Sequence, residues 1–111
     1  MNSWFIRTLA FCAVALTSYS VHAQAKTLTV YTYDSFNSEW GPGPVLKADF
    51  EKNCGCDLNF VSTDDAVSIL NRIRLEKDNS PADVILGLDN NLMTQAASLN
   101  LIAEHGSDLS A

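Results

Sequence analysis

Hydrophobic and polar positions divide the chain into segments that predict three β-strands. Residues 27–32 (TLTVYT) are mostly β-branched, aliphatic or aromatic, which predicts a buried strand with Val30 and Tyr31 in the core. The side chains of residues 56–62 (CDLNFVS) fall alternately on the two faces of an extended chain, which predicts a second strand. Residues 82–86 (ADVIL) are almost wholly apolar and predict a third.

A helix is predicted between the first two strands. In residues 45–53, Leu46 and Phe50 lie four positions apart and share one face of that helix. Asn53 or Gly55 can end it in a left-handed conformation. The predicted helix is short.

Two further helices follow the second and third strands. The acidic pair Asp64 and Asp65 opens the second helix, and residues 78–81 (DNSP) close it. Asn90 or Asn91 is expected to cap the third. The apolar stripes consist of Ala66, Ile69, Leu70 and Ile73 in the second helix and of Leu92, Met93, Ala96 and Leu99 in the third. The charged residues outside the stripe of the second helix are Arg72, Glu76 and Lys77.

The predicted elements therefore follow a βαβαβα order. Strands this apolar are typical of a parallel sheet that helices cover on both faces, so the sequence predicts an α/β fold with right-handed crossovers. Three strands with three helices make about half of an ordinary α/β domain. We therefore expect residues 24–111 to be an incomplete lobe of a larger protein.

The first 23 residues have the features of a secretory signal peptide. Arg7 lies in a short polar start, residues 9–16 are apolar, and a small residue, Ala23, ends the segment. We expect cleavage after Ala23. The apolar run is shorter than the roughly 20 residues that cross a bilayer, so the mature chain is not expected to be embedded in a membrane. Lipidation at Cys12 is disfavoured because the bulky Phe11 precedes it.

The chain is acidic, with a formal net charge of −6. Removal of residues 1–23 takes away one base, Arg7, and no acid, so the charge becomes −7. Such a balance repels nucleic acids and anionic membranes and excludes them as expected partners. It suits a cationic ligand, although a soluble secreted surface explains the same charge.

Cys54 and Cys56 remain after the predicted cleavage, separated by Gly55. Export places them in an oxidising compartment, which favours a structural disulfide between them. The spacing lacks the two intervening residues of thioredoxin-type motifs, so redox activity is a lesser alternative. Two thiols without a nearby histidine do not make a structural zinc site, which needs four ligands.

Candidate ligand-binding residues follow the three predicted strands. Ligands of open parallel sheets bind outside the carboxyl ends of the strands. The loops there contain Tyr33, Asp34, Ser35 and Phe36, then Thr63, Asp64 and Asp65, and finally Gly87, Leu88, Asp89, Asn90 and Asn91. We expect their carboxylates and aromatic rings, together with Trp40, to form one rim. Such a rim would suit a flat or quaternary cation.

Each of these residues also has a purely structural interpretation. Asp64 or Asp65 is expected to cap a helix whether or not it binds a ligand, and Asp89 can shape a turn. Trp40 precedes two Gly-Pro pairs and is expected to pack as a lid over its own loop at least as readily as it contacts a ligand. The sequence pattern alone leaves these alternatives open.

Motifs for catalysis are absent from the sequence. The serines lack the Gly-x-Ser-x-Gly elbow of hydrolases, and no glycine-rich phosphate-binding motif occurs. The pair Asp64 and Asp65 could hold a divalent metal, but a helix start explains it better. We therefore predict a binding protein rather than an enzyme, with no metal and no cofactor.

Four motifs together resemble a known family. They are residues 28–36 (LTVYTYDSF), 40–44 (WGPGP), 54–56 (CGC) and 82–91 (ADVILGLDNN). In combination they resemble the periplasmic thiamine-binding proteins of bacterial ABC transporters, which are type II solute-binding proteins. The resemblance runs through nearly all of residues 24–111.

The resemblance implies a periplasmic, monomeric receptor with two lobes, of which this chain supplies part of the N-terminal one. Its cleft would close on thiamine or thiamine phosphates and deliver them to the permease. Carried over by position, Tyr33 would pack on the ligand and Asp65 would accept hydrogen bonds from its aminopyrimidine. Asp34, Trp40, Asp64 and Asp89 are expected at the rim. The family's remaining aromatic and phosphate-binding residues would lie outside this chain.

Two other classes remain open at the level of sequence. One is a receptor of the same fold for a polyamine or for ferric ion; acids and aromatic rings would also suit a polyamine, whereas iron favours tyrosine and histidine ligands. The other is an exported α/β enzyme whose catalytic residues lie outside this chain.

Overall fold

The computed structural model describes residues 25–104 and 106. The predicted signal peptide, including its cleavage site after Ala23, lies outside these residues. The bounds are β1 Thr27–Tyr33, α1 Gly43–Cys54, β2 Asp57–Thr63, α2 Ala66–Glu76, the 3₁₀ helix η1 Lys77–Asn79, β3 Val84–Ile85 and α3 Asn90–Ser98. The predicted βαβαβα order is confirmed. No helix of the described residues is both long and apolar enough to cross a membrane.

The three strands form one parallel sheet in the order β2-β1-β3. β1 pairs with β2 along its whole length, from Thr27 opposite Asp57 to Tyr33 opposite Thr63. β3 is shorter than the predicted strand over residues 82–86 and pairs with β1 only through Val84 and Ile85. Its regular geometry is bounded by Pro81, which has no N–H group, and by Gly87, whose φ is +111°.

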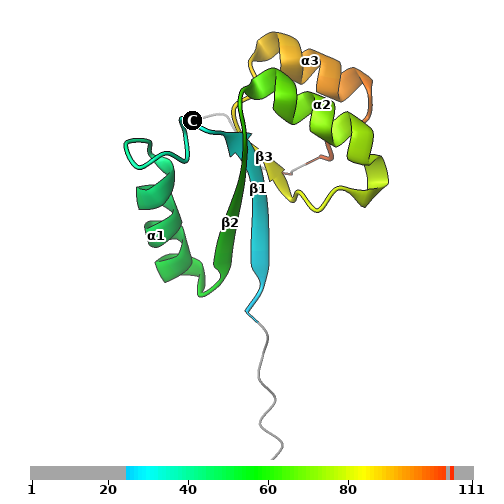
Figure 1. Ribbon diagram of the computed structural model, residues 1–111. Helices are drawn as coiled ribbons and strands as arrows, with labels where there is room; N and C mark the ends of the chain where they lie inside the picture. Colours follow the sequence, from blue (N-terminus) through cyan, green and yellow to red (C-terminus); the bar gives the residue numbers. More distant parts are fainter. Residues whose placement is uncertain (1–24, 105, 107–111) are drawn as a thin grey trace, which may run out of the picture.

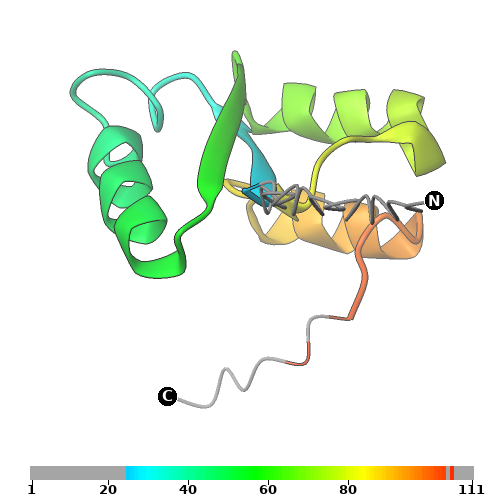
Figure 2. The ribbon, with the colours of Figure 1, turned by 90° about the horizontal axis from the view of Figure 1, so that it is seen from below.

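Helices lie on both sides of this sheet (Figures 1 and 2). α1 covers one side, and α2 and α3 pack together on the other. The hydrophobic core lies between β1 and α2, where Tyr31, Ile69 and Ile73 are buried against one another. Val30, also predicted as core, is 5% exposed. The α/β fold with a two-sided parallel sheet is therefore confirmed.

α1 leaves the apolar residues Leu46 and Phe50 partly exposed. Leu46 is 45% exposed and Phe50 38%, while Val45 is 75% exposed, and Gly43 is the helix's buried residue. The helix predicted over residues 45–53 is confirmed, and α1 contacts chiefly the edge strand β2. The surface around Pro44, Val45 and Ala48 stays open.

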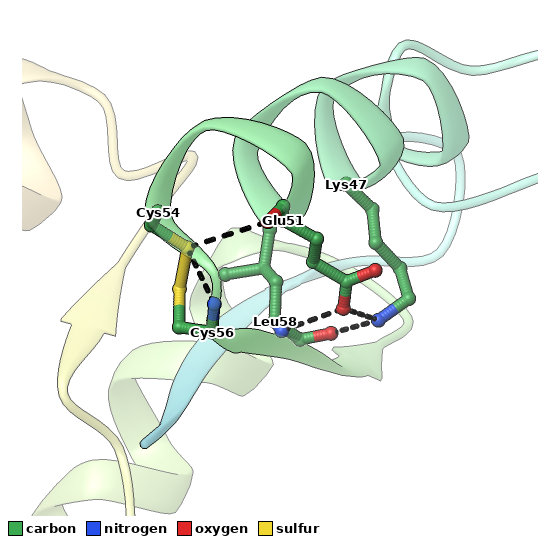
Figure 3. The surroundings of a disulfide bond; sticks show 5 residues. All are labelled: Lys47, Glu51, Cys54, Cys56 and Leu58. Atoms are coloured by element: carbon green, nitrogen blue, oxygen red, sulfur yellow. Dashed lines mark hydrogen bonds and ion pairs between the residues drawn. A yellow bond between two sulfur atoms is a disulfide. The ribbon is translucent and has the colours of Figure 1, made fainter. Parts of the chain in front are cut away.

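Polar contacts attach α1 to β2 instead (Figure 3). Lys47 donates to the Glu51 carboxylate and to the carbonyl of Leu58. Glu51 in turn accepts a 2.8 Å hydrogen bond from the Leu58 N–H. The Lys47 hydrogen bond, followed by the Leu58 N–H, lowers the pKa of Glu51. Helix and strand are thus joined at buried Leu58.

A disulfide closes the turn from α1 to β2. Cys54 and Cys56 are bonded, with their Cα atoms 5.2 Å apart (Figure 3). Gly55 lies between them at φ 62°, and its N–H donates to the Glu51 carbonyl at 3.0 Å. This left-handed glycine ends α1, as one of the two predicted residues.

A polar network joins the core to the end of α2. The buried Tyr31 hydroxyl lies 3.0 and 2.9 Å from the two carboxylate oxygens of Glu76. Arg72 donates a 2.8 Å hydrogen bond to the Glu76 carboxylate, and the Ser80 hydroxyl donates one of 2.9 Å to the same carboxylate. The Arg72 guanidinium also lies 4.6 Å from the centre of the Tyr31 ring. Arg72 and Glu76 lie outside the apolar stripe of α2 yet still contact the core residue Tyr31.

Candidate functional site

The parallel sheet brings the three predicted loops to the same edge (Figure 1). Two of them are bonded directly, since the Asp34 N–H donates to the Thr63 carbonyl at 2.8 Å. The Leu86 N–H donates to the Tyr31 carbonyl at 2.9 Å and extends the pairing of β1 with β3 toward this edge. The rim that the sequence predicts therefore has a common scaffold.

Tyr33 occupies the centre of the rim, at the end of the middle strand. Its ring is half-buried and meets Phe36 edge-on, with the ring centres 6.0 Å apart. Phe36 meets Phe60 in the same manner at 5.7 Å. Edge-to-face contacts of this kind fix ring orientation. Tyr33 therefore packs against Phe36, which itself packs against Phe60, while part of the Tyr33 surface stays accessible.

Asp65 caps α2, in agreement with its structural interpretation. Its Oδ1 accepts a 2.7 Å hydrogen bond from the Ser68 N–H. That bond is the main reason why the pKa of Asp65 is lowered. The side chain is nevertheless exposed at the rim. Since a carboxylate has a second acceptor oxygen, capping does not occupy the whole group.

Asp89 holds the corresponding position at α3. It accepts a 2.8 Å hydrogen bond from the Leu92 N–H and is the cap residue, so the expected capping by Asn90 or Asn91 is wrong. Those two residues are the first of the helix itself, where an oxygen side chain is one position too late to cap. Asp34 and Asp64 are exposed at the same edge.

Trp40 is almost fully exposed to solvent, with 92% of its area accessible. Backbone hydrogen bonds nonetheless hold its loop. The Gly41 N–H donates to the Ser38 carbonyl at 3.0 Å, and the Gly43 N–H donates to the Phe36 carbonyl at 2.9 Å. A Cβ at Gly41 would lie 2.3 Å from the Phe36 carbonyl oxygen, so the turn is too tight for a side chain there. The expectation that Trp40 packs as a lid over its loop is wrong, because the turn points the indole outward.

A cavity of about 1080 Å³ lies beside β3 and not over the rim. The end of α2, α3 and residues 99–104 enclose it, and only Gly87 and Leu88 belong to both places. Within residues 25–104 and 106, no three His, Cys, Asp or Glu side chains are close enough to hold a metal ion. The rim by itself is an open surface.

Sequence reasoning missed Gly87 as a neighbour of Tyr33 and Phe60 as an aromatic neighbour of Phe36. Phe60 was expected only as a strand residue, and Gly87 only as one member of a loop. A side chain on Gly87 would overlap the Tyr33 ring. The signal for Gly87 is that a glycine directly follows an apolar strand.

Comparison with known proteins gives consistent relatives, although no protein-family model matches the chain. It is 52% identical to the thiamine-binding periplasmic protein of Brucella suis over 101 residues, which are 90% of this chain and 30% of that protein. It is 58% identical to the Escherichia coli K12 protein of the same name over 79 residues, or 71% of this chain and 24% of that one. The chain thus spans less than a third of the length of these relatives.

Two solved structures share the fold. A periplasmic thiamin binding protein superposes with a TM-score of 0.73 at 53% identity, covering 78% of this chain and 27% of that one. Iron-bound HitA from Pseudomonas aeruginosa superposes with a TM-score of 0.59 at 24% identity, covering 71% of this chain and 24% of that one. This likeness shows the fold alone. The chain is therefore a homologue of part of the thiamine-binding periplasmic proteins, in a periplasmic-binding-protein fold.

Proposed function

We propose that this chain forms part of a receptor that captures thiamine and its phosphate esters for import. One observation carries the proposal: about half of its residues are identical to those of proteins named for thiamine binding, over 90% of the chain. The relatives are binding proteins, and the proposed activity is likewise binding, without catalysis, metal or cofactor.

The rim has the chemistry that thiamine would require. Thiamine joins an aminopyrimidine, which donates hydrogen bonds, to a positively charged thiazolium ring. Asp65 is proposed to accept from the aminopyrimidine through the oxygen that the α2 cap does not use. Tyr33 is proposed to pack against the ligand, and Asp34, Asp64, Asp89 and Trp40 to surround it. The four acids favour a cation, and Trp40 offers an open ring face.

The proposed setting is the periplasm, where the receptor would pass its ligand to the permease of an ABC importer. Residues 1–23 supply the predicted signal for export, and the relatives carry the word periplasmic in their names. A monomer is expected, since one ligand and one cleft need no second copy.

Calorimetry on the full gene product tests this function. Thiamine and thiamine monophosphate are expected to bind with one site per chain, whereas spermidine serves as a cation of unrelated shape. Binding of spermidine but not of thiamine would contradict the proposal and favour a polyamine receptor. Absence of binding for all three would also contradict it.

A further inference from the structure

The residue that lies opposite Tyr33, two positions after the end of β3, is a glycine. Tyr31 pairs with Ile85, and the register continued by two residues brings Gly87 beside Tyr33 on the same face of the sheet. A Cβ added to Gly87 would lie 2.4 Å from Cε1 and 2.5 Å from Cδ1 of the Tyr33 ring. The ring therefore lies directly on the Gly87 backbone, in space that any other residue would fill.

Gly87 meets a second requirement that other residues rarely satisfy. Its φ of +111° lies outside the left-handed region that asparagine or aspartate adopts. This turn carries the chain from β3 toward Asp89, the cap of α3. The same glycine thus shapes the loop of the third strand and provides the surface on which the ring of the first strand lies.

We propose that Gly87 is a positioning residue for ligand binding, acting through the Tyr33 ring. The inference rests on the proposed function, in which Tyr33 packs on thiamine. Phe36 bounds the ring at 6.0 Å between centres, and Gly87 bounds it from β3. A methyl group at position 87 must displace the ring or the β3 loop, and a misplaced aromatic surface loses its contact with a flat ligand.

The variant Gly87→Ala in the full gene product tests the proposal. Thiamine affinity is expected to fall by about tenfold, the scale of one aromatic contact. In NMR spectra of tyrosine-labelled protein, the Tyr33 ring signals should shift while those of Tyr31, held by Glu76, stay in place. The control is Gly55→Ala, which also places alanine at positive φ (+62°) but has nothing within 4 Å of its Cβ. It should leave both the affinity and the Tyr33 signals unchanged.

A double variant separates positioning from loop strain. In the Tyr33→Ala background, Gly87→Ala should cause no further loss of affinity, because the ring through which it acts is absent. If Gly87→Ala folds poorly, removal of the ring should restore part of its stability. An equal loss of affinity in both backgrounds, or wild-type affinity for Gly87→Ala, would overturn the inference. Failure of the wild-type protein to bind thiamine overturns the proposed function instead, and the Tyr33 signals still test the positioning.

Discussion

Asp65 joins two roles in one side chain. Its Oδ1 holds the first turn of α2, and its position at the sheet edge makes the other oxygen available to a ligand. Asparagine caps a helix about as well as aspartate does, but it carries no charge and only one acceptor oxygen. Substitution by asparagine therefore separates the two roles.

The first prediction is that Asp65→Asn in the full gene product weakens thiamine binding without unfolding the protein. Calorimetry measures the affinity, and thermal melting checks that the fold is kept. Asp89→Asn is the matched comparison, since Asp89 caps α3 in the same way but is expected only at the rim, so its loss of affinity should be the smaller one. Unchanged affinity in Asp65→Asn would leave Asp65 as a helix cap alone.

The sequence predicted the identity of the rim residues better than their contacts. Tyr33 ends a strand and Asp65 and Asp89 follow strands, and the parallel direction of the strands brings all three to one end of the sheet. The position of a cap within one residue, as between Asp89 and Asn90, depends on where the first helical turn closes. The outward direction of Trp40 depends on a tight turn whose geometry no hydrophobic pattern encodes.

At the scale of elements, the network around Glu76 ties β1 to the end of α2. Tyr31, Arg72 and Ser80 all donate to its carboxylate. The Arg72 hydrogen bond is the largest cause that lowers the pKa of Glu76. A group whose pKa is lowered on folding stabilises the fold above its unfolded pKa, about 4.3 for glutamate, and loses that contribution as the pH falls through the folded value.

The second prediction is that Tyr31→Phe lowers the free energy of unfolding by about 1–2 kcal/mol, because it removes a buried donor to a carboxylate. Urea unfolding at neutral pH measures the change. The control is Tyr33→Phe on the same strand, whose hydroxyl makes no hydrogen bond among the described residues. Equal effects of the two substitutions would contradict the role of the Glu76 contact.

The third prediction concerns pH at the same network. Glu76→Gln should destabilise the protein at neutral pH, and the difference from wild type should shrink as the pH falls below the unfolded pKa of glutamate, about 4.3, and through the lowered pKa of Glu76. Urea unfolding over a pH series provides the measurement. A difference that stays constant down to acidic pH would show that the carboxylate charge contributes nothing.

The fourth prediction concerns the disulfide, whose loss should act locally. Replacing Cys54 and Cys56 by serine opens a loop of three residues, for which the chain-entropy effect is about 1–2 kcal/mol. Amide exchange should become faster at Gly55 and in the last turn of α1. The Lys47 and Glu51 contacts should keep the rest of α1 on β2. Exchange through the whole helix would show that the disulfide, and not these contacts, holds α1.

At the scale of the whole molecule, the chain is much shorter than the relatives that it matches. The chain spans 30% of its Brucella suis relative, and its described sheet has three strands with β3 at one edge. The 1080 Å³ cavity opens beside that edge, with Val84 and Met93 partly exposed there. The order of strands and helices along the chain could be predicted from local patterns, but the cavity depends on how α3 and residues 99–104 pack, which no local pattern contains.

The fifth prediction is that the 111-residue chain binds thiamine far more weakly than its Brucella suis relative, a protein named for thiamine binding of which it spans 30%. The rim contacts a ligand from one side only and leaves its other sides in solvent. Small ligands gain affinity when most of their surface is buried. Parallel calorimetry on the two proteins makes the comparison. Comparable affinities would show that this part of the molecule contains the whole site.

The outward position of Trp40 gives the molecule a native optical probe. Within residues 24–111 it is the only tryptophan, and its indole is almost fully hydrated. Selective excitation should therefore yield the red-shifted emission of a ring in water, from one known place at the carboxyl edge of the sheet. Whatever covers that edge, ligand or polypeptide, should move the emission to shorter wavelength or quench it, without any attached dye.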